Sequence, residues 1–349
     1  MNQKVMIGMS GGVDSAVAAH LLKQKRYEVF GVTLRLYDGD GVCGSLDDAE
    51  DARRVAERLG ISHEVVSLSD VFRREVMDRF ADCYMRGETP NPCIDCNRYI
   101  KFGKMLAYAK EKNVEHIATG HYAKIEKDAS GRYLLKKAAD ANKDQTYVLY
   151  SLTQEQLAHT LFPLGSYRKS EIREIAEIEG FINARKRDSQ DICFVPDGDY
   201  AAFIERHTGL VFPEGDFVDT CGNRLGTHRG IIRYTVGQRK GLGIALGKPA
   251  FVCRKDVEQN RVVLGENEDL FSKVLTARDV NLIACDVLDS AVRVCAKIRY
   301  GQAEQPATAV MIEEGKMRVE FDEPQRAIAK GQSVVLYDGD TVVGGGIIE

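Results

Sequence analysis

The first part of the chain alternates between short apolar runs and longer amphipathic segments. Four runs have the length and composition of strands: 5–7, 28–34, 63–68 and 115–119. Residues 47–59 and 101–112 carry apolar side chains at helical spacing, and Asp70 is expected to cap a helix that follows the third strand. Strands that alternate with helices predict an α/β fold with a doubly wound parallel sheet.

The pattern becomes mixed after the fourth predicted strand. Residues 124–137 predict a hairpin that turns at 128–131, where the sequence reads DASG. Helical spacing returns at 153–160 and at 169–180. These segments still belong to the first, α/β part of the chain.

A second change of pattern occurs near Leu210. From there, short alternating strands are separated by turns such as TCGN at 220–223, with little helical spacing. This pattern predicts a small β-rich central domain followed by a C-terminal β-barrel. We therefore expect three domains, at 1–208, 209–273 and 274–349.

A glycine-containing loop follows the first predicted strand. Residues 10–15 read SGGVDS and lead directly into an apolar helix. A strand, a glycine turn and a helix N-terminus together form an anion site, because backbone N–H groups and the helix dipole face the ligand. Ser10 and Ser15 add hydroxyl donors. We expect Asp14 to face a metal ion carried by the phosphates, and both Asp14 and Ser15 to lie on an exposed turn.

This loop differs from two common nucleotide motifs. It lacks the Lys-Ser/Thr pair of the Walker loop and the G-x-G-x-x-G spacing of dinucleotide sites. It resembles the pyrophosphate loop of the N-type ATP pyrophosphatases, which split ATP into AMP and pyrophosphate. An ordinary strand-to-helix turn is the alternative, but the full hexapeptide after a strand favours a nucleotide site.

Composition narrows the class of protein. The 349 residues are 44% hydrophobic and 29% charged, as in soluble globular proteins. The sequence lacks a bilayer-length apolar run and a signal-peptide pattern, so we expect a cytoplasmic protein without a membrane partner. The net charge of −4 argues against indiscriminate nucleic-acid binding. A specific RNA partner would need local basic patches, for which 185–187 (RKR) and Arg239-Lys240 are the candidates.

Three of the nine cysteines stand apart from the others. Cys93 and Cys96 form a C-x-x-C pair in a predicted exposed loop that two prolines stiffen, and Cys193 lies in another predicted loop. The pair suits either a metal or a redox dithiol, although a structural zinc site normally needs a second such pair. We expect the other six to be small buried hydrophobic residues: Cys43, Cys83, Cys221, Cys253, Cys285 and Cys295.

Seven segments occur together in a specific order. They are GMSGGVDS (8–15), TPNPCIDCNRYIKF (89–102), ATGHYA (118–123), NKDQTYVLY (142–150), DSQDICF (188–194), GQRKGLG (237–243) and GGGII (344–348). The chain resembles the bacterial tRNA-specific 2-thiouridylases (the MnmA family) from end to end. This resemblance implies an ATP-pyrophosphatase domain of the adenine nucleotide alpha-hydrolase type, a small central domain and a tRNA-contacting β-barrel.

The resemblance also implies a reaction. ATP with Mg²⁺ adenylates O2 of the wobble uridine of certain tRNAs, and persulfide sulfur then displaces AMP to give 2-thiouridine. By motif position, Cys193 is the persulfide carrier and Cys96 the partner nucleophile. Cys96 would either free the sulfide or close a disulfide with Cys193 after transfer. A sulfur-donor protein and tRNA are the implied partners.

The resemblance implies binding residues as well. For ATP they are Gly8, Met9, Ser10, Gly11, Gly12, Val13, Asp14, Ser15, Leu34 and Gly120. For the target base and tRNA they are Asn91, Pro92, Cys93, His121, Lys143, Asp144, Gln145, Arg299, Tyr300 and Gln332. Without the resemblance, most of the second set have simple structural explanations, such as a solvated turn or a hydrogen-bonded loop histidine.

Cys93 departs from the family pattern. Many members carry an aspartate there, and its acid/base role does not carry over to a thiol. Cys93, Cys96 and Cys193 could together hold a [4Fe–4S] cluster with one open iron, which competes with the persulfide relay. Two other functions remain open: a small-molecule ATP pyrophosphatase, such as an argininosuccinate synthase or an NAD synthetase, and a nucleotide- and RNA-binding iron-sulfur sensor without turnover.

Overall fold

Five parallel strands organise the N-terminal part of the computed structural model, which describes residues 3–37, 45–186 and 192–349. They run in the order β3-β2-β1-β4-β7, and every pairing is parallel. Their bounds are β1 (Lys4–Gly8), β2 (Glu28–Arg35), β3 (Ser62–Ser67), β4 (His116–Ala118) and β7 (Thr160–Leu161). The predicted parallel sheet is confirmed. The helix predicted to reach residue 160 ends earlier, since α7 (Gln154–Ala158) gives way to β7.

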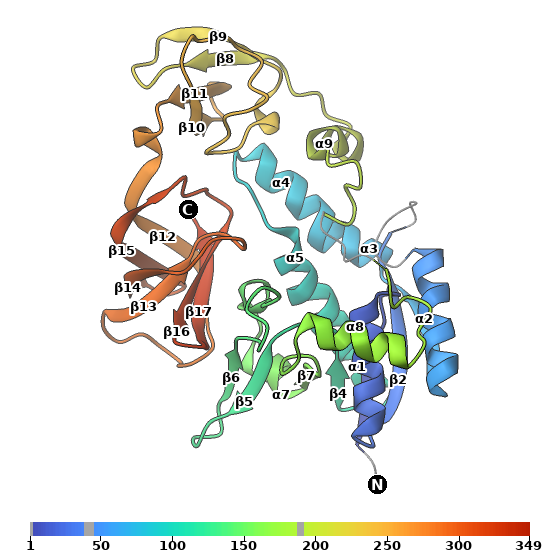
Figure 1. Cartoon of the computed structure of the whole chain (residues 1–349). Helices are drawn as coiled ribbons and strands as arrows, with labels where there is room; N and C mark the ends of the chain where they lie inside the picture. Colours follow the sequence, from blue (N-terminus) through green and yellow to red (C-terminus); the bar gives the residue numbers. More distant parts are fainter. Residues whose placement is uncertain (1–2, 38–44, 187–191) are drawn as a thin grey trace.

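Both faces of this sheet are covered (Figure 1). From β1, Val5 and Ile7 pack on one side in a core with α1 (Val13–Gln24), α2 (Leu46–Leu59) and α8 (Lys169–Ile178). Met6 points the other way, into a separate core with Phe102 and Met105. A strand buried on both faces reads as a continuous apolar run, which is why β1 was recognisable in the sequence.

Two long helical runs lie between β3 and β4 in the chain, and Phe102 and Met105 of the second run pack on the second face of the sheet. The first comprises α3 (Ser69–Phe72), a π-helical stretch Arg73–Asp78 and α4 (Arg79–Met85). Leu68 occupies its N-cap position, so the prediction that Asp70 caps it is wrong, and Asp70 lies inside the first turn. None of the helices within the described ranges is long and apolar enough to cross a membrane.

The second run carries the cysteine pair. It comprises α5 (Pro92–Asp95), a π-helical stretch Cys96–Lys104 and α6 (Met105–Glu111). The helix predicted at 101–112 therefore begins at Pro92, and the segment predicted as an exposed loop is helical. Pro92 sits at the first helical position, where its missing N–H costs nothing, and the Asn91 side chain caps the end.

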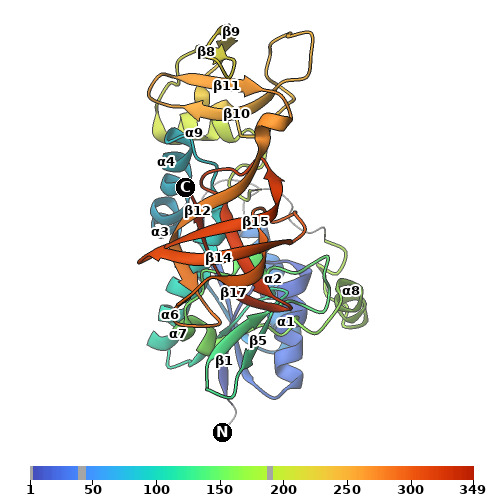
Figure 2. The same cartoon turned by 90° about the vertical axis from the view of Figure 1, so that its left-hand side faces the viewer.

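A separate four-stranded sheet lies at the opposite end of the molecule from the N-terminus (Figure 2). It follows α9 (Tyr200–Thr208) and has the order β10-β11-β8-β9. Its strands are β8 (Gly215–Val218), β9 (Arg224–His228), β10 (Phe251–Asp256) and β11 (Arg261–Gly265). Phe217 of this sheet shares one core with Phe80 of α4, so α4 links the parallel-sheet region to the central sheet.

The C-terminal strands form a closed barrel. They are β12 (Phe271–Leu282), β13 (Val292–Lys297), β14 (Gln305–Glu313), β15 (Lys316–Arg326), β16 (Ser333–Asp338) and β17 (Thr341–Ile348). The barrel closes because β12 pairs with both β15 and β17, as predicted. The predicted hairpin, β5 (Lys124–Lys127) and β6 (Tyr133–Lys136), extends the barrel sheet through the pairing of Lys136 with Thr341.

The chain between α4 and α5 is fixed by the barrel. The N–H of Thr89 donates to Lys330 O (2.7 Å), and the Gln332 side chain donates to Thr89 O (2.8 Å). Arg278 of β12 pairs with the carboxylate of Glu88 at 3.2 Å. The C-terminal barrel therefore positions the segment that leads into Cys93 and Cys96.

Candidate active site

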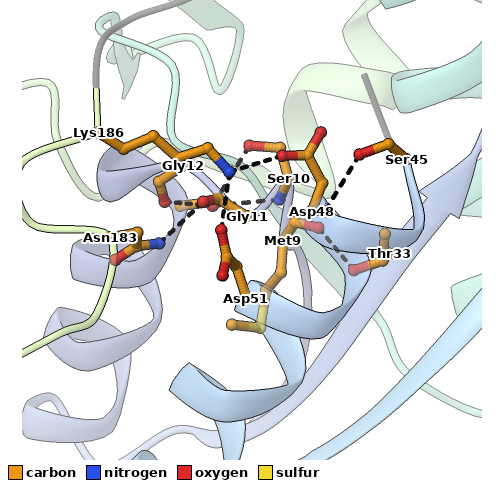
Figure 3. A network of polar contacts seen from close by, with 11 residues as sticks. Met9, Ser10, Gly11, Gly12, Thr33, Ser45, Asp48, Asp51, Asn183 and Lys186 are labelled. Carbon is orange, nitrogen blue, oxygen red and sulfur yellow. Dashed lines mark hydrogen bonds and ion pairs between the residues drawn. The ribbon is translucent and has the colours of Figure 1, made fainter. Parts of the chain in front are cut away.

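The loop Ser10–Ser15 is held by its own side chains and by a distant asparagine. The Ser10 N–H donates to Ser15 Oγ (3.2 Å), and the Ser15 hydroxyl donates to Gly12 O (3.0 Å). The Asn183 amide donates to Gly11 O (3.0 Å), as Figure 3 shows. These bonds fix the loop at the start of α1, where helix N–H groups face an anion.

Two glycines of the site are required by close approach. Gly11 has a φ of +69°, and a Cβ there would lie 2.5 Å from the backbone oxygen of Asp48. A Cβ on Gly120, after β4, would lie 2.9 Å from the backbone of Asp14 and Ser15. Any larger side chain would push the loop away from α2 or from β4.

The predicted basic run 185–187 is divided by the structure. Lys186 forms ion pairs with Asp48 and Asp51 of α2, each at 2.8 Å, beside the glycine loop (Figure 3). Arg185 has a side chain that is 90% exposed and lies 3.6 Å from the Glu177 carboxylate. Residue 187 lies outside the described residues. Lys186 is therefore paired with α2 beside the loop, and a role of this run in RNA binding stays a prediction.

Asp14 is engaged from behind the loop. Its Oδ1 accepts hydrogen bonds from Lys169 Nζ (2.7 Å) and from the Tyr122 hydroxyl (2.7 Å), and its Oδ2 accepts from Lys169 at 2.8 Å. Ser15 is only 5% exposed. The expectation that both residues lie on an exposed turn is wrong, because α8 and the chain after β4 cover the loop. Oδ2, with the single contact, is the atom that could approach a phosphate-bound Mg²⁺.

A cavity of about 190 Å³ opens beside this loop. Seven of the residues predicted to bind ATP line it: Gly8, Met9, Ser10, Asp14, Ser15, Leu34 and Gly120. The other described lining residues are Val32, Leu36, Lys101, Met105, Thr119, His121 and Gln145. Gly11, Gly12 and Val13 belong to the same loop but do not line the cavity, and Val13 is buried.

Cys96 and Cys193 contact one apolar cluster. Cys96 is 9% exposed and belongs to this cluster together with Leu36, and Cys193 packs against it while partly exposed. Leu36 also lines the cavity, and Leu34 both lines the cavity and packs on the cluster. The two predicted catalytic cysteines, from distant parts of the sequence, thus contact the same apolar cluster, and this cluster borders the cavity through Leu34 and Leu36.

Cys93 lies apart from this cluster. It is exposed on α5, and its N–H donates to the capping Asn91 side chain (3.1 Å). Within the described ranges, three His, Cys, Asp or Glu side chains nowhere gather in an arrangement that could hold a metal ion. The residues present therefore do not fit the three-thiolate arrangement that the sequence suggested for Cys93, Cys96 and Cys193.

The remaining cysteines are less buried than expected. Cys221 is exposed in the turn after β8, which contradicts its predicted burial. This turn is built on Asp219, whose carboxylate accepts the Cys221 N–H, so the thiol has no core to enter. The others, apart from Cys43, which lies outside the described residues, are partly exposed rather than buried: Cys83, Cys253, Cys285 and Cys295.

His121 lies at the cavity wall and is neutral. Burial first, and then the nearby Lys101 ammonium, hold the pKa of His121 well below its usual value. Its Nδ1 lies 2.7 Å from the Thr119 hydroxyl, and its Nε2 lies 3.5 Å from Lys101 Nζ. Because an ammonium can only donate, Nε2 accepts and Nδ1–H donates to Thr119.

The predicted tRNA residues of the loop after the hairpin also support the fold. Gln145 Oε1 accepts the Tyr122 N–H (2.8 Å). The Asp144 carboxylate accepts from the Ala138 N–H (3.0 Å) and the Thr146 hydroxyl (2.5 Å). Lys143 precedes them and is partly buried.

The predicted barrel residues lie at the junctions between regions. The Tyr300 hydroxyl donates to Asp144 O (3.3 Å), and Tyr300 is also within electrostatic range of Cys93. Arg299 donates to Ala327 O (2.7 Å). Gln332, as described above, reaches the segment before Cys93. Pro92 is buried at the start of α5. Tyr300 therefore brings the barrel next to the cysteine helix.

Sequence reasoning missed several residues of the site. Lys101, Lys169, Tyr122 and Asn183 line the cavity or hold its loop, but none was predicted. Lys101 lies inside the recognisable segment 89–102 and Tyr122 inside 118–123, so their segments were the available signal. Lys169 and Asn183 carried no such signal.

The parallel sheet, the glycine loop at a helix N-terminus and the neighbouring cavity define a nucleotide-binding α/β protein with a C-terminal β-barrel. Three family models match the chain: a tRNA methyl transferase HUP domain at 3–197, a tRNA methyl transferase PRC-barrel domain at 201–266, and an aminomethyltransferase beta-barrel domain at 272–348. Full-length relatives specify the family further. The chain belongs to the tRNA-specific 2-thiouridylases of the MnmA family.

Two of these relatives set the level of similarity. The tRNA-specific 2-thiouridylase MnmA of Clostridioides difficile (strain 630) is 56% identical over 356 aligned positions, which cover 100% of this chain and 99% of the relative. The protein of the same name from Acetivibrio thermocellus is 53% identical, with 99% of each chain covered.

Two solved structures with a related fold are much more distant in sequence. An NMN synthetase from Francisella tularensis is 18% identical with a TM-score of 0.36, covering 60% of this chain and 78% of that one. A 4-thiouridine synthetase in an RNA complex with bound ATP is 18% identical with a TM-score of 0.40, covering 59% and 50% respectively. Neither bears on the chemistry of this chain.

Proposed function

We propose that this chain is an ATP-dependent sulfurtransferase that converts the wobble uridine of selected tRNAs to 2-thiouridine. The observation that carries the proposal is the adjacency of two features. A glycine loop at a helix N-terminus faces a cavity, and this cavity borders the cluster that Cys96 and Cys193 contact. Family membership supports the same function. The three-domain division at 208 and 273 is retained as part of the proposal.

The nucleotide step activates a poor leaving group. Uridine O2 attacks the α-phosphorus of ATP, and the bond to pyrophosphate breaks with its electron pair leaving on pyrophosphate. The loop Ser10–Ser15 would hold the phosphates through N–H groups and hydroxyls, with Leu34 and Gly120 on the adenosine side. Mg²⁺ would be bound with the phosphates near Asp14, and it would neutralise part of their charge.

The sulfur step uses a soft nucleophile. The terminal sulfur of a Cys193 persulfide attacks C2, and AMP leaves with the electrons of the C2–O bond. The Cys96 thiolate then attacks the Cys193 sulfur, so the S–S bond breaks toward the uridine sulfur and N3 takes a proton. The Cys96–Cys193 disulfide formed would be reduced by an external thiol. In the alternative order, Cys96 first frees sulfide from the persulfide.

Both orders require Cys96 and Cys193 to meet, and their common apolar cluster supports this. A [4Fe–4S] cluster would also need the thiolate of Cys93, which is exposed on α5. The exposure of Cys93 therefore favours the persulfide relay over an iron-sulfur cluster. The sulfur would come from a donor protein in the cytoplasm, where thiols stay reduced.

The target base would be bound between the cysteine helix and the barrel. Cys93 and Tyr300 are within electrostatic range of each other there. The other candidates for the base and the tRNA are Asn91, Pro92, His121, Lys143, Asp144, Gln145, Arg299 and Gln332. An extruded base needs stacking and edge hydrogen bonds, which a tyrosine ring and polar loop groups would supply.

Two measurements on the purified protein test this function. Pyrophosphate release from ATP, with and without an unmodified tRNA transcript, measures adenylation. Mass spectrometry of the digested tRNA, after supply of a persulfide donor, measures thiolation. We expect both to depend on tRNA, and Cys193→Ser to release pyrophosphate without thiolating. Pyrophosphate release that needs no tRNA would point to a small-molecule substrate, and no release at all would point to a sensor.

A further inference from the structure

Lys101 lines the nucleotide cavity, and it has no role in the steps described above. It lies in the π-helical stretch Cys96–Lys104, on the same helical run as Cys93 and Cys96. Its side chain is half-buried and lines the same cavity as the loop residues Ser10 and Ser15. The run that carries the cysteines thus also sends a cation into the nucleotide cavity.

Lys101 supplies positive charge to a cavity wall that otherwise has little of it among the described residues. Among the described residues that line the cavity, Lys101 is the sole lysine or arginine and Asp14 the sole carboxylate. Lys169 neutralises Asp14 from behind and does not itself line the cavity. From the described part of the cavity wall, a bound triphosphate would therefore meet backbone N–H groups, hydroxyls and the Lys101 ammonium. In a site of low dielectric constant, that cation has a large effect on charge that develops during reaction.

A hydrogen-bond chain orients this cation. Lys101 Nζ lies 3.5 Å from Nε2 of His121, whose Nδ1 in turn lies 2.7 Å from the Thr119 hydroxyl. The imidazole is neutral, so it adds no competing positive charge. An ammonium has three donors, and a contact to His121 is therefore compatible with a second contact to a phosphate oxygen.

Lys101 also reaches toward the base side of the site. It is within electrostatic range of Cys93, a residue proposed above to lie around the target uridine. A group between the nucleotide cavity and Cys93 is placed where uridine O2 and the α-phosphorus must meet. The β- and γ-phosphates, which leave together, need not lie near this point.

We propose that Lys101 is a catalytic residue of the adenylation step, whose ammonium binds a non-bridging oxygen of the α-phosphate. This inference rests on the proposed function. The new bond joins uridine O2 to the α-phosphorus, the bond to pyrophosphate breaks with its electron pair, and the uridine N3 proton passes to water. Lys101 stabilises the negative charge that builds on the non-bridging oxygens between these events, and it keeps its own proton.

The alternative is that Lys101 only positions His121. Two variants separate these roles. Lys101→Gln keeps an N–H donor for His121 but removes the charge, and Lys101→Arg keeps the charge with a different shape. Lys104→Met is the matched control, because Lys104 belongs to the same π-helical stretch but is exposed and does not line the cavity.

Single-turnover release of pyrophosphate with saturating tRNA is the readout, together with the dissociation constants of ATP and tRNA and the thermal midpoint. We expect Lys101→Gln to slow pyrophosphate release by about 10²–10³-fold, as for loss of a charge-stabilising donor in other enzymes. ATP and tRNA binding should change by less than about threefold, Lys101→Arg should restore part of the rate, and Lys104→Met should behave as wild type.

Three results would overturn the inference: a Lys101→Gln rate near that of wild type, a defect confined to ATP binding, or a lowered thermal midpoint that Lys101→Arg does not repair. If wild type itself releases no pyrophosphate with tRNA, the proposed function fails instead. The two failures are therefore distinguishable.

Discussion

Lys169 of α8 places its ammonium between both carboxylate oxygens of Asp14, at 2.7 and 2.8 Å, across the base of the glycine loop. The Lys169 side chain is 10% exposed and that of Asp14 30%. The ion pair joins the first turn of α1 to the first turn of α8, two elements far apart in the chain. It keeps a carboxylate next to a phosphate site without leaving its charge uncompensated.

Lys169 does not line the cavity, but its removal should still weaken ATP binding through Asp14. In Lys169→Met, the Asp14 carboxylate would face the phosphates unneutralised, and we expect the dissociation constant for ATP to rise at least tenfold, about 1.4 kcal/mol. The broken pair should also cost about 2 kcal/mol of unfolding free energy, less than for a fully buried pair because Asp14 is partly exposed. Calorimetric titration and urea unfolding measure the two effects.

The double variant Asp14→Asn/Lys169→Met is the control. It removes both charges, so it should recover most of the stability lost in the single variant. If Lys169→Met binds ATP as tightly as wild type, Asp14 does not face the phosphates.

We expect the exposed pair Arg239-Lys240 to bind tRNA phosphates. It is preferred to the other basic run, because Lys186 of that run forms ion pairs with α2. Arg239→Glu should raise the tRNA dissociation constant several-fold. It should also reduce the slope of log affinity against log salt, because a protein that makes fewer phosphate contacts releases fewer counterions when it binds. ATP binding should not change. Lys25→Glu, at the end of α1 remote from the glycine loop, is the control. Equal salt slopes for Arg239→Glu and wild type would contradict this assignment.

How far the sequence led can be seen at particular residues. β1 and β2 were predictable because apolar side chains fill both faces of the sheet, and the SGGVDS loop was predictable because its chemistry is local. The barrel could be inferred from alternating strands and turns, and its closure follows from β12 pairing at both edges. In these cases neighbouring residues in the chain carry the signal.

The failures involve contacts between distant residues or competing uses of one residue. Pro92 suggested a loop but starts a helix, because Asn91 caps it. Lys186 was predicted only as part of a basic run, and its pairing with Asp48 and Asp51, some 135 residues earlier in the chain, was not foreseen. Lys169 gave no sign in the helical pattern that it would reach Asp14. Spacing along the chain does not encode such pairs.

Asp95 supplies a prediction about pH. Burial is the largest influence on this carboxyl and raises its pKa from 3.8 to about 6, although Arg79 lies 3.7 Å away. Because the folded-state pKa lies above the unfolded value, the native state binds the proton more tightly. The contribution of Asp95 to stability is therefore most favourable below about pH 4 and falls as pH rises through about 6.

Asp95→Asn should remove this dependence. We expect the variant to be more stable than wild type at pH 8 by about 2 kcal/mol, with the difference vanishing near pH 4. Urea unfolding at both pH values measures it. A variant that is destabilised at pH 8 would mean that the ionised carboxylate stabilises the fold, and that burial does not dominate.

The last prediction separates the persulfide relay from an iron-sulfur cluster. Cys96 and Cys193 contact one apolar cluster while Cys93 is exposed on α5, so a relay needs the first two thiols and not the third. Protein purified without oxygen should be colourless and free of iron, and Cys93→Ala should still thiolate tRNA at a substantial fraction of the wild-type rate.

Cys96→Ala and Cys193→Ala should lose thiolation and keep tRNA-dependent pyrophosphate release, because adenylation precedes sulfur transfer. Cys221→Ala, at an exposed turn, is the control for loss of a thiol. A brown anaerobic protein that loses its colour and its thiolation in Cys93→Ala would instead establish the cluster.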